Sequence, residues 1–366
     1  MQQIEYPYDE HPAPGNTIEV APGVRWLTMP MGGSLAHINL YLLEDRSGWY
    51  VVDTGLPLEN VEALWHEIFT KELGGKPVIG VICTHFHPDH VGQASMIANH
   101  FRCPLYMTRS EYYQARAFSN NAARSTHSSW TGTDFYYRAG MPMSFLEDLS
   151  KEFEQRSSDG MSMPEMPSGY IRLQAGDTLE IGGRDWRIVV GEGHSPEHAC
   201  LYCAELDLMC SGDQILPIIT SNVSVHPTEP EGNPLSFWMK SLEDFMSTPD
   251  DTFILPAHNL PFYGVRYRLR ELIDHHEDRL LAVEEACLEP QLAKDLLPVL
   301  FRRELDARQT MMALGEAIAH VHLLMQRNRI ERSLHEDGQY RFRSIDPNLA
   351  HRSHPTQGPD DLPQLV

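Results

Sequence analysis

The chain has few cysteines, no long apolar run and few basic residues. Its six cysteines, spread over 366 residues, do not make the dense framework of a small disulfide-stabilised secreted protein. No run of about 18 apolar residues occurs, so we expect no membrane span. Residues 1–15 lack the basic and then apolar pattern of a signal peptide. We therefore expect a reduced, cytoplasmic protein with no membrane partner.

Acidic residues clearly outnumber basic ones. Lys and Arg together number 29 and Asp and Glu 51, so the formal net charge is −22. A surface of this sign repels phosphate, which favours a small-molecule substrate and disfavours a nucleic acid. A hydrophobic fraction of 42% and a charged fraction of 22% predict a globular chain. From the length we expect two domains, or one large domain with an appendage. The sequence leaves open whether the protein forms a homodimer.

Short apolar runs alternate with segments of helical spacing, which predicts an α/β fold. We expect strands at 23–27, 37–43, 49–52, 78–83, 104–107, 170–173, 178–181, 186–190, 199–203 and 252–256. We expect helices at 60–71, 91–99 and 267–288. Residues 110–167 are polar, aromatic and rich in Met, and we interpret them as a mostly helical insertion that acts as a lid.

The C-terminal part has a different pattern. A predicted helix at 307–327 is followed by two strand-like runs around a Gly turn, which is typical of the end of a winged-helix module. We therefore divide the chain into a catalytic domain at 1–290, a winged-helix-like module at 291–345 and a disordered tail at 346–366.

Residues 84–90, with the sequence THFHPDH, carry three imidazoles and one carboxylate directly after a buried strand. Side chains two residues apart in an extended loop can converge on one ion. Zinc and similar metals favour imidazole and carboxylate ligands. The motif therefore predicts a metal site formed by His85, His87, Asp89 and His90.

Four further residues occupy comparable positions. Asp53, His194, Asp213 and His258 each follow an apolar, strand-like run. In α/β sheets, sites form where the carboxyl ends of strands meet, so we expect these side chains to join the motif at one edge.

With these motifs placed, the sequence resembles the metallo-β-lactamase superfamily over about residues 18–263. The resemblance implies a four-layer αβ/βα sandwich with a helical insertion, a small winged-helix-like C-terminal module and a binuclear metal site. It implies that His85, His87 and His194 bind one ion, that Asp89, His90 and His258 bind the other, and that Asp213 bridges them. Asp53 would orient ligands by hydrogen bonding. Family members that hydrolyse β-lactams typically carry Cys or Ser at the bridging position, so antibiotic hydrolysis is not expected.

The same resemblance implies hydrolysis by a hydroxide that bridges two divalent ions, most simply Zn²⁺, with iron or manganese as alternatives. Asp89 would orient this nucleophile or transfer its proton. The motifs and C-terminal module are similar to the glyoxalase-II-like and β-lactamase-like protein 2 branches, which favours an ester, lactone or, preferably, an acyl thioester. Three alternatives stay open: a phosphodiesterase or ribonuclease, a mononuclear iron persulfide dioxygenase, and a non-catalytic ligand-binding effector.

Other polar and aromatic residues are weaker candidates. We expect His198 to lie behind the ligands and His226 to reach substrate. Aromatic side chains adapt to acyl chains or rings, and an arginine can pair with an anion, so the insertion supplies further candidate substrate contacts: Tyr112, Arg116, Tyr136 and Tyr137. His320 and His322 are excluded as a ligand pair, because residues two apart on a helix point about 200° apart.

Overall fold

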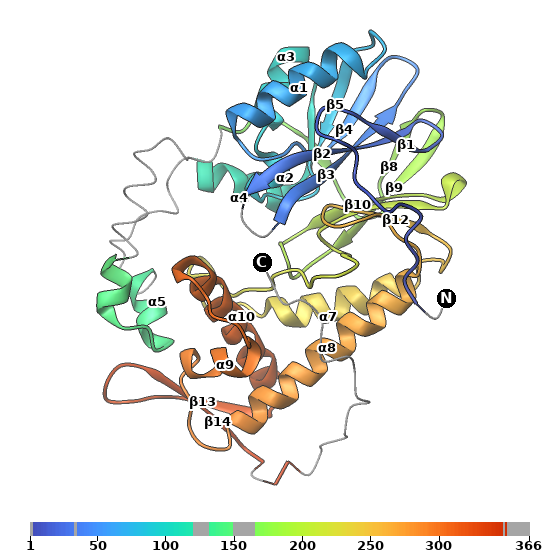
Figure 1. The fold of residues 1–366 in the computed structure, drawn as a ribbon. Helices are drawn as coiled ribbons and strands as arrows, with labels where there is room; N and C mark the ends of the chain where they lie inside the picture. The colour runs from blue at the N-terminus through green and yellow to red at the C-terminus, as the bar shows by residue number, and fades with distance from the viewer. Residues whose placement is uncertain (1–2, 33–34, 120–131, 149–164, 347, 350–366) are drawn as a thin grey trace.

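The structure is a computed structural model that describes residues 3–32, 35–119, 132–148, 165–346 and 348–349. Two β-sheets pack face to face, and helices cover both outer faces (Figure 1). The first sheet has the order β1 (Ile18–Ala21), β2 (Val24–Gly32), β3 (Leu35–Glu44), β4 (Trp49–Val52), β5 (Val78–Ile82), β6 (Leu105–Thr108) and β7 (Ile171–Leu173). The second has the order β12 (Phe253–Pro256), β11 (Leu208–Gly212), β10 (His198–Cys203), β9 (Arg184–Gly191) and β8 (Thr178–Ile181).

Each sheet mixes antiparallel and parallel strands. β1 to β4 run antiparallel to their neighbours, whereas β4 to β7 are parallel. In the second sheet only β11 and β12 are parallel. The run VIGVI of β5 is almost continuously apolar because this strand lies in the parallel part of the sheet, covered on both faces.

A hydrophobic core lies between the sheets. Trp26 of β2, Tyr41 of β3 and Ile82 of β5 meet Trp186 of β9 and Leu201 of β10, all of them buried. Trp26 keeps its indole N–H satisfied by donating to the side-chain oxygen of Asn39 (3.0 Å). This shared core holds the two sheets in one orientation.

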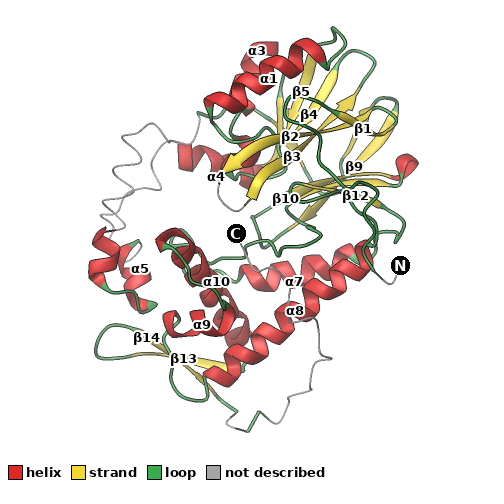
Figure 2. Ribbon diagram, in the orientation of Figure 1, coloured by secondary structure: helices red, strands yellow, loops and turns green. Residues whose placement is uncertain are grey.

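The helices complete the four layers (Figure 2). The outer face of the first sheet packs against α1 (Glu59–Lys71) and α3 (Ala94–Phe101), and that of the second against α7 (Pro234–Phe245) and α8 (Val265–Ala286). The short helices α2 (Pro88–Val91) and α4 (Arg109–Ser119) lie at one edge of the first sheet. The predicted four-layer α/β sandwich is therefore confirmed. Among the described residues, no helix has the length and apolarity needed to cross a bilayer.

The C-terminal module follows α8. It contains α9 (Leu297–Leu300), α10 (Ala307–Gln326) and the two-stranded sheet of β13 (Ile330–Leu334) and β14 (Tyr340–Ser344). Asp306 caps α10 in a capping box with Gln309. A helix followed by a hairpin is thus present where the sequence predicts it, whereas its classification as a winged helix and the domain boundaries stay predictions.

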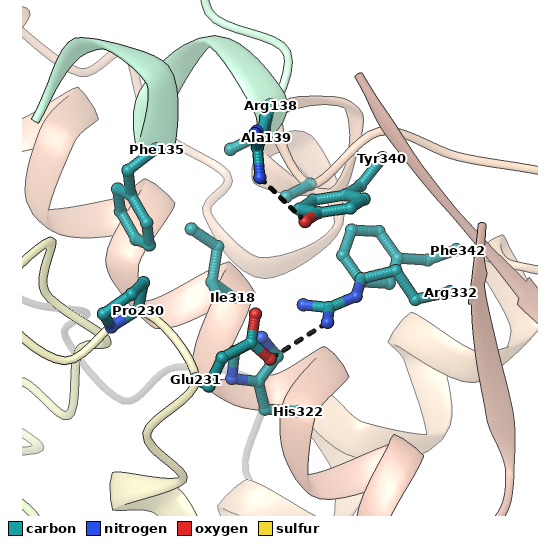
Figure 3. Close-up of a pocket in the computed structure, with 11 residues that line it drawn as sticks. Phe135, Arg138, Ala139, Pro230, Glu231, Ile318, His322, Arg332, Tyr340 and Phe342 are labelled. Atoms are coloured by element: carbon teal, nitrogen blue, oxygen red, sulfur yellow. Dashed lines mark hydrogen bonds and ion pairs between the residues drawn. The ribbon is translucent and has the colours of Figure 1, made fainter. Parts of the chain in front are cut away.

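The described part of the insertion forms helices in two separate places in the fold. α4 continues directly from β6, whereas α5 (Thr133–Arg138) lies against the C-terminal module. The guanidinium groups of Arg138 on α5 and Arg332 on β13 lie 5.7 and 4.5 Å from the ring centroid of Tyr340. These three residues line a cavity of about 60 Å³, which is drawn in Figure 3. The Tyr137 hydroxyl donates to the carbonyl of Asp337 (2.9 Å). Residues 120–131 and 149–164, and almost all of the predicted tail, lie outside the described residues, so the lid and the disordered tail stay predictions.

One carboxyl group of α10 makes stability depend on pH. Burial raises the pKa of Glu316 from 4.5 to about 8, although Arg279 opposes the shift. The folded chain therefore keeps a proton that the unfolded chain loses, and stability falls as the pH rises from about 4.5 to about 8. At about 1.4 kcal/mol per pKa unit, the loss amounts to several kcal/mol.

We therefore expect Glu316→Gln, which has no charge to bury, to melt several degrees above the wild type at pH 8. The two melting temperatures should converge near pH 4. Thermal melts across this range test the prediction, and a constant difference between the two proteins would contradict it.

Candidate metal centre

The predicted metal ligands gather at one edge of the sandwich. Asp53 follows β4, residues 85–90 follow β5, His194 follows β9, Asp213 follows β11 and His258 follows β12. Both sheets thus contribute the carboxyl ends of their strands. Pro88 occupies the first position of α2, where its fixed φ suits a helix start. The chain therefore turns directly after His87 and carries Asp89 and His90 on a helical turn.

A first group consists of His85, His87, His194 and Asp213. Their ligand atoms all lie within 4.8 Å of one another. His85 Nε2 is 2.9 Å from His87 Nδ1 and 3.2 Å from His194 Nε2. Asp213 Oδ2 lies 3.3 Å from His194 Nε2 and 3.8 Å from His85 Nε2.

A second group consists of Asp89, His90 and His258, whose ligand atoms meet the same 4.8 Å limit. Asp89 Oδ2 is 3.5 Å from both His90 Nε2 and His258 Nε2. Asp213 lies between the two groups, because its Oδ2 is 3.5 Å from His90 Nε2 and its Oδ1 is 3.4 Å from His258 Nε2. This is the place that a bridging carboxylate would take.

The opposite nitrogens of the imidazole rings are held by the protein. His90 Nδ1 is 2.8 Å from Asp53 Oδ2, and His194 Nδ1 is 2.8 Å from the carbonyl of Asn222. The Thr84 hydroxyl donates to Asp53 (2.9 Å) and lies 3.1 Å from His85 Nδ1. His85, His90 and His194 thereby keep their Nε2 atoms for the centre of the site. Asp53 has a φ of +59°, a left-handed conformation that Asp tolerates better than most residues.

The electrostatics favour cation binding. Burial and the neighbouring imidazoles hold the pKa of His85 well below its ordinary value, and burial followed by His194 lowers the pKa of His87 to about 3. Burial alone would raise the pKa of Asp213, but the surrounding imidazoles lower it well below its ordinary value. Burial alone would lower the pKa of His90 and His258, but the carboxylates of Asp89 and Asp213 outweigh burial and raise both. A bound cation would displace those protons, because a metal ligand must be a neutral imidazole or an ionised carboxylate.

Two buried polar atoms of the site lack a hydrogen-bond partner among the described residues, and divalent ions would bind them. His90 Nε2 and Asp213 Oδ1 are buried and make no hydrogen bond within the described part of the chain. Buried polar atoms are normally paired, so unpaired atoms at the centre of seven donor side chains indicate a place where a cation would bind. The nitrogen and oxygen donors suit zinc, iron or manganese. The residues present therefore fit two divalent ions.

His198 and His226 also lie close to the predicted site. His198 is fully buried, and its Nε2 accepts the backbone N–H of Asp213 (3.0 Å), so it supports the loop that carries this carboxylate. His226 lines a cleft of about 200 Å³ that opens beside His194. Its contact with substrate stays a prediction.

The aromatic candidates of the insertion make protein contacts instead. Tyr112 stacks on Tyr170 at 3.9 Å between ring centroids, and Arg116 donates to the Tyr112 hydroxyl (3.1 Å). Tyr136 packs against the hydrophobic core to which α10 contributes, and Tyr137 contacts the hairpin of the C-terminal module. The structure does not bring these four residues to the metal ligands, and their role toward substrate stays a prediction.

Sequence analysis missed Glu111, which joins the two ligand loops. This residue of α4 is fully buried and accepts the backbone N–H of Phe86 (3.0 Å), the Ser195 hydroxyl (2.7 Å) and the backbone N–H of Glu197 (2.7 Å). Burial raises its pKa to about 7, although these hydrogen bonds oppose the shift. Phe86 lies between two ligands and Ser195 follows a third. Glu111 thus fixes the distance between the two loops.

Comparisons with known proteins agree with this geometry. Residues 34–258 match the model of the metallo-beta-lactamase superfamily, and residues 280–345 match that of the metallo-beta-lactamase-like C-terminal domain. A crystal structure of a beta-lactamase domain protein from Burkholderia ambifaria is 41% identical, with a TM-score of 0.85 over 93% of this chain and 98% of that one.

More distant relatives include the probable metallo-hydrolase YflN of Bacillus subtilis, 21% identical over 69% of this chain and 90% of its own. The acyl-coenzyme A thioesterase MBLAC2 of Homo sapiens is 21% identical over 53% of this chain and 63% of its own. The family model covers more than half of the chain and includes the ligands of both groups. The chain therefore belongs to the metallo-β-lactamase superfamily.

Proposed function

We propose that the protein is a binuclear metal-dependent hydrolase that cleaves small carbonyl esters, with an acyl thioester as the preferred substrate and lactones or oxygen esters as related ones. The observation that supports this proposal most strongly is the position of Asp213 between two complete ligand groups. One group would hold each ion and Asp213 would contact both. We infer zinc as the resident metal from the imidazole-rich donor set.

When bound, two such ions lower the pKa of a shared water and polarise the carbonyl oxygen of the substrate. The chain itself supplies orientation and a proton acceptor. Asp89 has a side-chain exposure of 15%, against 9% for Asp213, so it is the more accessible to water of the two acidic ligands. In our proposal Asp89 orients the attacking water through a carboxylate oxygen and receives its proton.

The reaction is a simple hydrolysis. A bond forms between the water oxygen and the acyl carbon, and the bond from that carbon to sulfur breaks. The proton held at the Asp89 carboxylate then passes to the leaving thiolate, so that the products are a carboxylic acid and a thiol. No serine or cysteine nucleophile is required, and no oxidant or reductant is consumed.

The cleft beside His194 supports a small, weakly charged substrate. Its described lining combines the apolar rings of Phe86 and Phe237 with Gln114, and its charged members are Glu192 and Glu229, with no Lys or Arg among them. Apolar rings would accommodate an acyl group. Two carboxylates disfavour a polyanion such as RNA, because like charges repel in a cleft. This favours thioester hydrolysis over phosphodiester hydrolysis.

A substrate panel tests the proposal on the metal-loaded protein. The panel contains an acyl thioester of a small neutral thiol, a lactone and bis-(p-nitrophenyl) phosphate, with oxygen uptake followed in parallel on a persulfide substrate. We expect kcat/KM for the thioester to exceed that for the phosphodiester by at least about 100-fold, or roughly 3 kcal/mol.

Three results would overturn the proposal. Faster turnover of the phosphodiester would indicate a phosphodiesterase. One iron per chain together with oxygen uptake would indicate a dioxygenase. Bound metal without turnover of any substrate in the panel would indicate a ligand-binding protein.

A further inference from the structure

We propose that helix α10 of the C-terminal module is a structural part of the metal centre, and that Asn222 and Glu316 are positioning residues for the ligand His194. The proposal concerns how the centre is held together. It rests on His194 being a metal ligand and is independent of which bond the enzyme cleaves.

The first step is the contact of His194 with the chain at 222. The ring N–H at Nδ1 of His194 donates to the carbonyl oxygen of Asn222 (2.8 Å), while Nε2 faces Asp213 (3.3 Å). A backbone acceptor at Nδ1 selects the tautomer whose Nε2 lone pair is free for a cation. The position of the Asn222 carbonyl therefore sets the orientation of this ligand.

The second step is that α10 holds the side chain of Asn222. Its Nδ2 donates to Glu316 Oε2 (3.3 Å), and its Oδ1 accepts the Ser224 hydroxyl (2.7 Å). The Ser224 hydroxyl oxygen also lies 3.1 Å from the carbonyl of Met312 on α10. The amide nitrogen is thus tied directly to the helix, and the amide oxygen accepts from a hydroxyl that lies against the helix.

The third step is a close backbone contact. The N–H of Val225 donates to the carbonyl of Gly315 (3.0 Å). A Cβ at position 315 would lie 2.8 Å from Ser224 Cβ and 3.0 Å from the carbonyl oxygen of Val225. Glycine at 315 therefore lets residues 222–225 lie directly on α10, which a larger residue would prevent.

The contacts that hold His194 differ from those that hold the other ligands. Asp53 and Thr84, which hold His90 and His85, belong to the strand ends of the first sheet. The carbonyl acceptor beside His258 Nδ1 is that of His37, on β3. Loss of the α10 contacts should therefore weaken the ion of the His85, His87 and His194 group more than the other ion.

Glu316 is the residue of α10 whose side chain contacts that of Asn222, and Arg279 also acts on its carboxyl group. It is 6% exposed, and Asn222 is the side chain with which it forms a hydrogen bond. A buried carboxyl group is costly unless it is paired, so an apolar side chain would serve packing better. A carboxamide at 316 keeps an oxygen that accepts the N–H of Asn222, whereas a leucine of similar size does not.

The test compares Asn222→Ala, Glu316→Leu and Glu316→Gln with Arg327→Ala in the full-length protein. Arg327 pairs with Glu277 at 2.8 and 2.9 Å, directly after α10 and away from residues 222–225, so Arg327→Ala is the matched control. Zinc affinity is measured by competition with a chelator, and the visible absorption spectrum is recorded after cobalt(II) substitution. Melting curves confirm that each variant folds.

We expect Asn222→Ala and Glu316→Leu to bind one of the two ions about 10- to 100-fold more weakly and to change the cobalt spectrum. Glu316→Gln and Arg327→Ala should keep the affinity and the spectrum of the wild type. If Glu316→Leu does not fold, Asn222→Ala decides the question, because it keeps the backbone carbonyl.

Two results would overturn the inference. The first is wild-type affinity with an unaltered cobalt spectrum in Asn222→Ala. The second is an equal loss in Arg327→Ala, which would indicate general loosening of the module. If Asp213→Ala bound both ions as tightly as the wild type, the metal centre itself would be wrong, and this inference with it.

Discussion

Replacing Asp213 by alanine should remove the bound ions and abolish turnover. The Asp213 carboxylate oxygens lie 3.3 to 3.8 Å from Nε2 atoms of four imidazoles, and these imidazoles belong to both ligand groups. Without this carboxylate, the two ligand groups would lose the one side chain that both can share, and each would hold one ligand fewer. Because loss of an outer hydrogen bond already costs about 10- to 100-fold in affinity, we expect a loss of more than about 100-fold.

The measurement is metal content by elemental analysis, together with thioester hydrolysis at a fixed zinc concentration. His322→Ala is the control, because His322 donates to the carbonyl of Gly232 (2.7 Å) and lies in the cavity of Figure 3, away from the ligands. We expect it to keep both ions. An active, metal-free Asp213→Ala protein would refute the assignment of the centre.

The second large effect is expected at Asp53. Its carboxylate accepts the backbone N–H of Thr84 (2.8 Å) and the Thr84 hydroxyl, and it contacts His90 Nδ1 (2.8 Å). Asp53→Ala leaves these buried donors without a partner, at about 1–3 kcal/mol each. We expect a melting temperature lower by many degrees and weak binding of the ion at His90.

The substitution Asp53→Asn removes the negative charge of this side chain but keeps its shape. Asparagine tolerates the left-handed backbone at φ +59° and keeps one acceptor oxygen. Its amide N–H₂ faces either Thr84 or His90, so one donor is still mismatched. We therefore expect folding close to that of the wild type and about 10- to 100-fold weaker metal binding. Equal melting temperatures and equal affinities in Asp53→Ala and the wild type would show that this carboxylate supports nothing.

The fold and the clustering of these His and Asp side chains were predictable because both follow from local sequence patterns. Period-2 and period-3.6 apolar spacing distinguishes strands from helices over short windows, and a buried run such as that of β5 needs no partner to be recognised. The motif at 85–90 places three imidazoles within six residues. His194, Asp213 and His258 could be added because strand ends of this fold class converge on one edge.

The support of the ligands was not predictable in the same way. Glu111 lies in the first turn of α4, where an exposed glutamate is common, and its burial follows only from the approach of the loop at 195–197. Glu316 and Asn222 are 94 positions apart, and neither has a sequence signature. Such contacts depend on how helices and loops pack in the tertiary structure. A local sequence pattern carries no information about that packing.

The aromatic residues of the insertion illustrate a different limit. A tyrosine buries the same surface against a ligand or against a neighbouring helix, so its sequence context does not separate the two. Tyr137 donates to the turn of the hairpin, and Tyr112 stacks on Tyr170. Composition predicted a surface rich in rings, but the partner of those rings depends on tertiary structure.

The distribution of the ligands along the chain has a consequence for biosynthesis. The centre takes residues from position 85 to position 258 and from both sheets, so no nascent fragment that ends before His258 contains the complete set. Because domains mature from the N-terminus as the ribosome advances, the first sheet emerges with His85, His87 and His90 long before their counterparts. In the proposed binuclear centre, acquisition of both cations would therefore be a late step, and full metal occupancy would mark a chain whose two halves have already associated.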